Sequence, residues 1–217
     1  MPKAVSGNID FAYNSSANLK YSMSFSASMK KVFISPNKLY LDSFRLARKI
    51  YQSGFRPDFL IGIWRGGTPP GIIVHEYFRV KGIDPYHTAI KTQSYRGLKT
   101  TGEVEIKGME HVLRELSREQ KLLIVDDVWD TGITIKKVLE FIKERKGKNA
   151  PDIKVGVVYF KEAKNQVELV PDYYYKIIND WIVFPHELEG LTREEIRQKS
   201  KVIEKLVFDE GANAPLR

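Results

Sequence analysis

One segment in the middle of the chain constrains the fold more than any other. Residues 122–125 form an apolar run of the type that makes a buried strand, and two adjacent carboxylates, Asp126 and Asp127, follow directly. A short loop rich in hydroxyl groups and glycine comes next, and residues 135–142 have the pattern of a helix. A strand, a tight loop and a helix in this order place free backbone N–H groups around a small concavity, which suits a phosphate.

The two carboxylates add a second requirement to this site. Open α/β sheets bind ligands outside the carboxyl ends of their strands, which is where Asp126 and Asp127 are expected. A phosphorylated sugar, held at its phosphate by the loop and at its hydroxyls by the acids, would satisfy both halves. The competing interpretation is a surface turn, in which Asp, Thr and Gly are ordinary residues. A third acid, Asp130, and the pair Thr131 and Thr134 exceed what such a turn requires.

The rest of the chain alternates between strand and helix patterns. Ser35 and Pro36 have the residue types of a helix N-cap and first turn, and Gly54 is placed to end that helix. Alternation predicts an α/β fold, with a mostly parallel twisted sheet flanked by helices. Strands are predicted at residues 59–64, 86–92, 122–127, 153–160 and 173–178, and helices at 36–53, 70–80, 109–116, 133–145 and 192–207.

Composition divides the chain into three parts. Residues 1–28 are rich in serine and asparagine, carry few charges and lack a secretory apolar core, so a disordered or loosely attached extension is predicted. Met29 also reads as an alternative start, which would make this extension an artefact of the assigned start. Residues 29–190 are predicted to form the main domain, and residues 191–217 a C-terminal helix and tail.

Charge and cysteine content exclude some classes of protein. The 217 residues include 35 basic and 27 acidic ones, and the formal net charge of +8 favours an anionic ligand. Basic and acidic residues are interspersed, however, so a solvated charged surface explains this charge better than a nucleic-acid-binding patch. No apolar stretch approaches the ~18–20 residues of a membrane helix. The lack of cysteine excludes disulfides and thiolate catalysis and fits a cytoplasmic protein.

Residues 122–134 closely resemble the signature of the type I phosphoribosyltransferases, which bind 5-phosphoribosyl-1-diphosphate (PRPP). The resemblance covers residues 36–188 and implies that family's fold, with a small base-binding hood inside residues 29–190. It implies that Asp126 and Asp127 hold the ribose hydroxyls. Members that act on 6-oxopurines (hypoxanthine, guanine or xanthine) carry an acid at the position of Asp130, so that branch is indicated. The residues implied at the 5-phosphate are Asp130, Thr131, Gly132, Ile133 and Thr134.

The turn after strand 59–64 matches a second part of the family pattern. Arg65, Gly66 and Gly67 follow Trp64, and glycines at such a turn let the backbone approach a ligand closely. In 6-oxopurine enzymes a basic residue and two glycines at this place bind the diphosphate, often through a strained peptide bond, so Arg65 is implied as the diphosphate residue. Without the resemblance, the same residues would indicate a glycine turn with a solvent-facing arginine.

Residues 93–105 form a long polar stretch, which in a compact domain indicates a lid or a binding segment. Within it, Ser94 and Tyr95 resemble the mobile catalytic loop that closes over the diphosphate. Closure would exclude the water that could intercept an oxocarbenium-like transition state. The alternative for this stretch is an exposed hairpin.

The residues implied at the base come later in the chain. Lys161 follows strand 153–160 directly, and the resemblance implies that it donates a hydrogen bond to the 6-oxo group. Trp181 would stack on the base, and the backbone of Ile182 would meet its C2 side. A positive donor prefers an oxo base, because the amino group of adenine would be left mispaired. Taken alone, Lys161 would indicate a solvent lysine and Trp181 a core residue.

The segment Pro185-His186-Glu187 departs from the family pattern. Relatives carry tryptophan and then an acid after this proline, so Glu187 keeps the acid and His186 replaces an aromatic residue. Glu187 is implied near the base and, with Asp126 and Asp127, as a candidate ligand of Mg²⁺, the cofactor that the resemblance implies. His186 leaves the choice between xanthine and guanine open.

The resemblance therefore implies an enzyme of purine salvage. It would transfer the 5-phosphoribosyl group from PRPP to N9 of a 6-oxopurine and release pyrophosphate and a nucleoside 5′-monophosphate, with Asp130 as general base near N7. A homodimer or homotetramer without membrane or nucleic-acid partners is expected. Two alternatives stay open: a PRPP-sensing regulator of the same fold that binds nucleic acid, and a phosphoribosyltransferase for another base.

Overall fold

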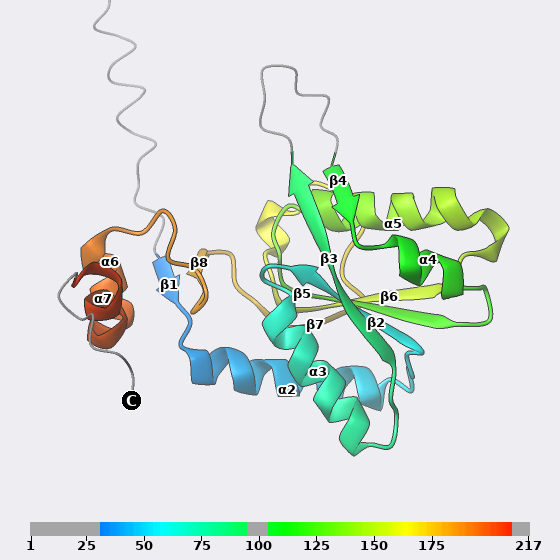
Figure 1. Cartoon of the computed structure of the whole chain (residues 1–217), viewed down its shortest axis with the longest axis horizontal. Helices are drawn as coiled ribbons and strands as arrows, with labels where there is room; N and C mark the ends of the chain where they lie inside the picture. The colour runs from blue at the N-terminus through cyan, green and yellow to red at the C-terminus, as the bar shows by residue number, and fades with distance from the viewer. Residues whose placement is uncertain (1–30, 95–103, 210–217) are drawn as a thin grey trace, which may run out of the picture. The chain divides into compact units, whose positions relative to one another are not determined.

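The structure, a computed structural model, describes residues 31–94 and 104–209. The predicted extension 1–28, Tyr95 and the end of the C-terminal tail lie outside the described residues. Six strands form one sheet in the order β4-β3-β2-β5-β6-β7, and every neighbouring pair except β3–β4 is parallel. The predicted α/β fold with a mostly parallel sheet is thus confirmed (Figure 1). These strands are β2 (Phe59–Trp64), β3 (Tyr86–Ser94), β4 (Val104–Lys107), β5 (Lys121–Trp129), β6 (Asp152–Phe160) and β7 (Tyr173–Ile177).

Helices cover both faces of this sheet (Figure 1). The alternation along β5 explains why, since successive side chains of a strand point to opposite faces. Leu122 and Ile124 join the core under α5, whereas Leu123 and Val125 join the core under α2 and α3. An unbroken apolar run is therefore the pattern of a strand that is buried on both faces. The helices are α2 (Pro36–Gln52) and α3 (Thr68–Val80) on one face, and α4 (Glu110–Glu115) and α5 (Ile133–Lys146) on the other.

A second, two-stranded sheet stands apart from the main one. In it, β1 (Lys31–Phe33) pairs in parallel with β8 (Trp181–Val183), and α6 (Arg193–Lys199) and α7 (Lys201–Phe208) follow in the chain. The sequence predicted neither strand, because a three-residue strand carries too little alternation to recognise. None of the helices in the described part of the chain is long and apolar enough to cross a bilayer.

The prediction of a single helix over residues 192–207 is wrong, because two helices occupy this segment. Thr192 and Glu195 form the expected capping box at the start of α6, but this helix ends at Lys199. Ser200 then adopts an extended backbone with φ −167°, and its side chain accepts a hydrogen bond from the backbone N–H of Ile203. Ser200 therefore starts α7 as an N-cap, in the way that Ser35 starts α2.

Two strand boundaries also differ from the prediction. The strand predicted at 122–127 continues to Trp129, because Val128 and Trp129 keep the alternation going beyond the two acids and Trp129 is buried. The polar stretch 93–105 is partly strand, since β3 extends to Ser94 and pairs with β4 from Val104 onward.

The strand order places a crevice between β2 and β5. From β2 the chain continues to its neighbour β3, whereas from β5 it continues to β6 on the opposite side. At such a reversal the connections leave the carboxyl ends in opposite directions, and the gap between them is where open α/β sheets bind ligands. The turn after β2 and the loop after β5 both open at this point.

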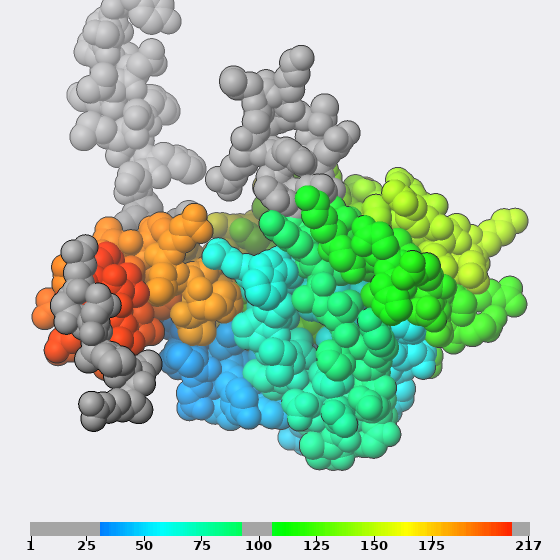
Figure 2. All heavy atoms as spheres, in the orientation of Figure 1, coloured from blue at the N-terminus to red at the C-terminus, as the bar shows by residue number. Residues whose placement is uncertain are grey.

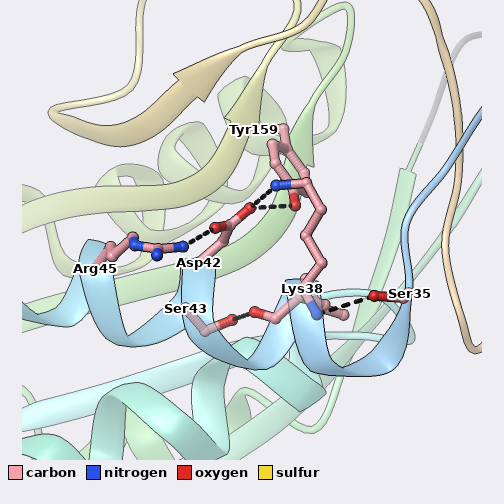
Figure 3. A network of polar contacts seen from close by, with 7 residues as sticks. Ser35, Lys38, Asp42, Ser43, Arg45 and Tyr159 are labelled. Atoms are coloured by element: carbon pink, nitrogen blue, oxygen red, sulfur yellow. Dashed lines mark hydrogen bonds and ion pairs between the residues drawn. The ribbon is translucent and has the colours of Figure 1, made fainter.

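A buried carboxylate joins α2 to β6 (Figure 3). Asp42 is 0% exposed and accepts hydrogen bonds from Tyr159 Oη at 2.7 Å, Lys38 Nζ at 2.7 Å and Arg45 Nη1 at 2.6 Å. Burial by itself raises the pKa of Asp42, but the hydrogen bonds from Lys38, Tyr159 and Arg45 outweigh it and the pKa is lowered. Asp42 is thus held as a carboxylate. Burial, and then the hydrogen bond to Asp42, raises the pKa of Tyr159.

We predict that Asp42→Ala lowers the free energy of unfolding by about 1–3 kcal/mol, because it leaves the buried Tyr159 hydroxyl without an acceptor. Adding Tyr159→Phe should recover part of this loss, since no donor is then unpaired. The folded-state pKa of Asp42 is depressed, so its stabilisation is complete above the ordinary value of 3.8 and is lost as the pH falls below it. Urea titrations at neutral and acid pH test this; additive losses in the double variant would contradict it.

Candidate functional site

A cleft of about 310 Å³ opens at the carboxyl ends of β2 and β5. Three stretches of chain that are distant in sequence meet there: the turn after β2, the end of β5 with its loop, and the segment after β8. Their residues that line the cleft are Ile63, Trp64, Arg65 and Gly66; Asp126 to Gly132, Thr134 and Ile135; and Phe184, His186 and Glu187, with Thr92 of β3 beside them.

The two acids of β5 lie in this cleft as the sequence predicted. Asp127 is only 6% exposed, and its backbone N–H donates to Asp126 Oδ1 at 3.0 Å. Burial, and then the neighbouring charge of Asp127, raises the pKa of Asp126 well above its ordinary range. The acid pair therefore favours a ligand that brings hydroxyl donors or positive charge.

The loop 130–132 between β5 and α5 is held against a later segment of the chain. Gly132 has φ +81°, a conformation that favours glycine, and a Cβ there would lie 2.5 Å from Val167 Cγ2. The carbonyl of Thr131 accepts a hydrogen bond from the N–H of Gln166 at 2.9 Å. The N-cap residue Gly132 has no side chain to cap α5, and the N–H of Ile133 makes only a long contact of 3.4 Å with Thr131 Oγ1, so the first turn of α5 beside the cleft suits an anion.

The turn after β2 lies directly against β5. A Cβ on Gly66 would lie 2.3 Å from Asp127 Oδ2, and a Cβ on Gly67 would lie 2.4 Å from the carbonyl oxygen of Val125. Both positions therefore require glycine if the turn is to approach the acids. The Trp64–Arg65 peptide bond is cis. The Arg65 guanidinium is more than half exposed and only 3.8 Å from Glu189 Oε2, a weak contact that leaves it able to reach an anion.

A buried lysine faces the loop acid. Lys161 is 7% exposed, and its Nζ lies 3.2 Å from Asp130 Oδ1. The backbone N–H of Lys161 donates to the carbonyl of Trp129, so the ends of β5 and β6 are tied together here. Asp130 Oδ1 has no hydrogen-bond partner within the described residues. One positive donor and one acceptor therefore stand side by side next to the acid pair.

The third wall of the cleft is a turn after β8. The rings of Phe184 and His186 stack at 5.4 Å with an interplanar angle of 14°, and His186 Nε2 lies 3.3 Å from Asp127 Oδ2. Glu187 Oε2 accepts the backbone N–H of Phe184 at 3.1 Å, so this carboxylate closes the turn itself. We call residues 184–187 the hood turn.

The structure brings together nine of the residues predicted for the site, as lining residues of one cleft. Lys161 is joined to them through Asp130. The nine are Arg65, Gly66, Asp126, Asp127, Asp130, Thr131, Gly132, Thr134 and Glu187. Their predicted roles in binding and catalysis stay predictions, because the structure carries no ligand.

Other predicted residues lie elsewhere. Gly67 packs behind the turn, the side chain of Ile182 is buried in the core, and Ile133 is exposed at the start of α5. Trp181 is 47% exposed on β8, and Lys164 Nζ lies 5.9 Å from its ring centroid, so its role at a base stays a prediction. Ser94 ends β3, and Tyr95 lies outside the described residues.

Several lining residues were missed by the sequence analysis. Trp64 and Thr92 sit at the ends of parallel strands, and the strand-end rule that found the acids would also have found them. Trp129 was missed because the strand was predicted to end at the two acids, whereas β5 continues beyond them. Phe184 gave no signal, since an apolar residue after a short strand is ordinary.

Most of this chain is similar to known phosphoribosyltransferases. Residues 36–191 match the family described as "Phosphoribosyl transferase domain". A xanthine-guanine phosphoribosyltransferase of Idiomarina loihiensis is 28% identical over 174 residues, which is 77% of this chain and 97% of that protein. A hypoxanthine-guanine phosphoribosyltransferase of Bos taurus is 26% identical over 173 residues, which is 76% of this chain and 77% of that protein.

Solved structures agree in fold. A purine phosphoribosyltransferase from Pyrococcus horikoshii superposes with a TM-score of 0.58 and 29% identity, covering 76% of this chain and 98% of that one. A xanthine-guanine-hypoxanthine phosphoribosyltransferase of Helicobacter pylori has a TM-score of 0.59 at 18% identity, covering 78% of this chain and 99% of that one. At that identity the likeness concerns the fold alone.

We predict that Gly66→Ala destabilises the protein by about 1–3 kcal/mol, because the new methyl group displaces the Asp127 carboxylate. Gly71→Ala on α3 is the matched control: its Cβ would meet its nearest neighbour at 3.6 Å, an ordinary contact. The control should be neutral or stabilising by up to about 1 kcal/mol, since alanine favours helices. Chemical denaturation of both variants tests this, and equal changes would contradict the close approach of the turn.

Proposed function

Since this chain belongs to the phosphoribosyl transferase family, we propose that it transfers the 5-phosphoribosyl group of PRPP to N9 of a 6-oxopurine. The products would be pyrophosphate and a nucleoside 5′-monophosphate. The relatives named for xanthine, guanine and hypoxanthine support this substrate class. The single observation that carries the proposal is the pairing of Lys161 with Asp130 at the cleft.

That pair matches one edge of a 6-oxopurine. O6 is an acceptor and N7 lies next to it on the same edge, so Lys161 can donate to O6 while Asp130 accepts the proton that N7 carries. Lys161 Nζ and Asp130 Oδ1 are 3.2 Å apart, so the two side chains are close enough to contact neighbouring atoms of one base. Adenine presents an amino donor instead of O6, and a donor that faces the Lys161 ammonium would be left unpaired.

PRPP would occupy the rest of the cleft. The first turn of α5, whose N-cap Gly132 makes no side-chain cap hydrogen bond, and the hydroxyls of Thr131 and Thr134 support binding of the 5-phosphate. The acid pair, Asp126 and Asp127, would accept hydrogen bonds from the ribose hydroxyls, which offsets the repulsion between two neighbouring carboxylates. Arg65 would meet the diphosphate from the turn after β2.

The donor atoms of the cleft also fit Mg²⁺. Hard cations prefer carboxylate oxygens, and Mg²⁺ typically takes one or two protein carboxylates while keeping water and substrate phosphate oxygens. Asp126 and Asp127 fit this use, because a nearby positive charge would favour the ionised form of both neighbouring carboxylates. The Glu187 carboxylate is a weaker candidate, because it already accepts the backbone N–H of Phe184 within the hood turn. A bound Mg²⁺ would neutralise charge on the diphosphate.

The side chains would act in the transfer by orientation and charge. N9 attacks C1 of the ribose as pyrophosphate leaves, and Arg65 stabilises the charge that develops on the leaving group. Asp130 holds the proton at N7 as general base, while Lys161 fixes the base through O6. An oligomer and a cytoplasmic location are part of this proposal, the latter supported by the lack of cysteine.

Initial rates test the proposal. With PRPP and Mg²⁺, we expect turnover of at least one of hypoxanthine, guanine and xanthine, and kcat/KM for adenine lower by on the order of 10³-fold or more, since the mispaired amino group is costly. Comparable rates with adenine would contradict the assignment to 6-oxopurines. Absent transferase activity together with tight, salt-dependent nucleic-acid binding in a filter assay would establish the regulator instead.

A further inference from the structure

One lysine of the C-terminal helices donates hydrogen bonds to the backbone of the hood turn. Lys199, at the end of α6, donates from Nζ to the carbonyls of Phe184 at 2.6 Å, Pro185 at 3.3 Å and Glu187. An ammonium group has three N–H donors, and here each is directed to the same four-residue turn. Burial lowers the pKa of Lys199, which the charge of Glu187 opposes.

Lys199 is one part of a larger arrangement around the hood turn. The family match covers residues 36–191, and β1, α6 and α7 lie outside these residues. β1 pairs with β8, the N–H of Ile34 donates to the carbonyl of Val183 at 3.0 Å, and Lys31 forms an ion pair with Glu195 of α6. The segments before and after the family match thus contact each other next to β8. Figure 2 shows the orange-to-red surface of the C-terminal segment, which includes α6 and α7, as one continuous area.

The cleft side of the hood turn faces the reaction centre. Phe184 packs between the ring of Tyr159, at 5.9 Å, and the stacked ring of His186. His186 Nε2 in turn lies 3.3 Å from Asp127 Oδ2. A shift of the turn would therefore move His186 away from the acid pair and move the carboxyl end of β8 with it.

We propose that Lys199 is a positioning residue, through which the C-terminal helices hold the hood turn and β8 at the cleft so that the base is bound in register with PRPP. The proposal rests on the proposed function for its substrates. The mechanism is geometric: Lys199 fixes three carbonyls on one side of the turn, and the stack of Phe184 on His186 carries that position to the other side.

Hydrogen–deuterium exchange of the full chain tests the clamp without any need for turnover. In Lys199→Met, which keeps most of the apolar stem of the side chain but removes its donors, exchange at the amides of residues 182–184, 186 and 187 should rise about tenfold or more, as expected for loss of local stability. Exchange in residues 122–134 should not change. Lys201→Met, an exposed lysine at the start of α7, is the matched control and should leave both regions unchanged.

Kinetics then test the positioning role. Lys199→Met should raise KM for the base or lower kcat by about ten- to hundredfold, because small misplacements are costly in catalysis. The Kd for PRPP should change less, because Lys199 contacts only the hood turn, whereas PRPP would also be held by the loop 130–132 and Arg65. Lys199→Arg, which keeps charge and donors, should recover most of the loss and gives the same information if the Met variant does not fold.

Each outcome decides one claim. Unchanged exchange at residues 182–187 in Lys199→Met would overturn the clamp. Raised exchange with unchanged base kinetics, or equal losses in base and PRPP binding, would overturn the positioning role. A wild-type chain without turnover would count against the proposed function instead, and the exchange experiment would still decide whether Lys199 holds the turn.

Discussion

The parallel pairing of β2 with β5 is the constraint on which the rest of the structure depends. Its register, from Phe59 opposite Leu122 to Gly62 opposite Val125, brings the carboxyl ends of both strands to one place. The turn after β2 can lie against the acid pair only because Gly66 and Gly67 carry no side chains. Since the chain leaves these two strands in opposite directions, the place where they end is also where the sheet opens.

Two carboxylates of the resulting cleft each lie close to a side-chain nitrogen. Asp130 faces Lys161 at 3.2 Å, and Asp127 faces His186 at 3.3 Å. Lys161 is 7% exposed, so removing Asp130 would leave a buried ammonium group without its nearby carboxylate, which is unfavourable. Under the proposed function, a purine that offers an acceptor to Lys161 and a donor to Asp130 would give each side chain a partner on the base. The Lys161–Asp130 pair would thus select one kind of base edge.

Structural features that depend on a local sequence pattern could be predicted from the sequence. Features that depend on contacts between residues far apart in the chain were missed. The apolar run, the acids and the helix after them were sufficient to predict the cleft around Asp126 and Asp127, since strand ends and loop chemistry are local. The pairing of β1 with β8 is set by partners about 150 positions apart, as in Lys31 with Trp181, so no local pattern marks it. The break at Ser200 was missed because the apolar spacing continues through it, and Tyr95 lies outside the described residues.

The proposed role of Asp130 at the base is tested most directly by measuring kcat and the Kd for PRPP separately in a variant of this residue. Asp130→Asn keeps the shape of the side chain but cannot accept the N7 proton, so kcat should fall by about 10²–10⁴-fold, the range of general acid–base catalysis. The Kd for PRPP should change far less, and Glu140→Gln on the exposed side of α5 should change neither. Equal losses of kcat and PRPP affinity in Asp130→Asn would show that Asp130 serves only the phosphate and would contradict its role at the base.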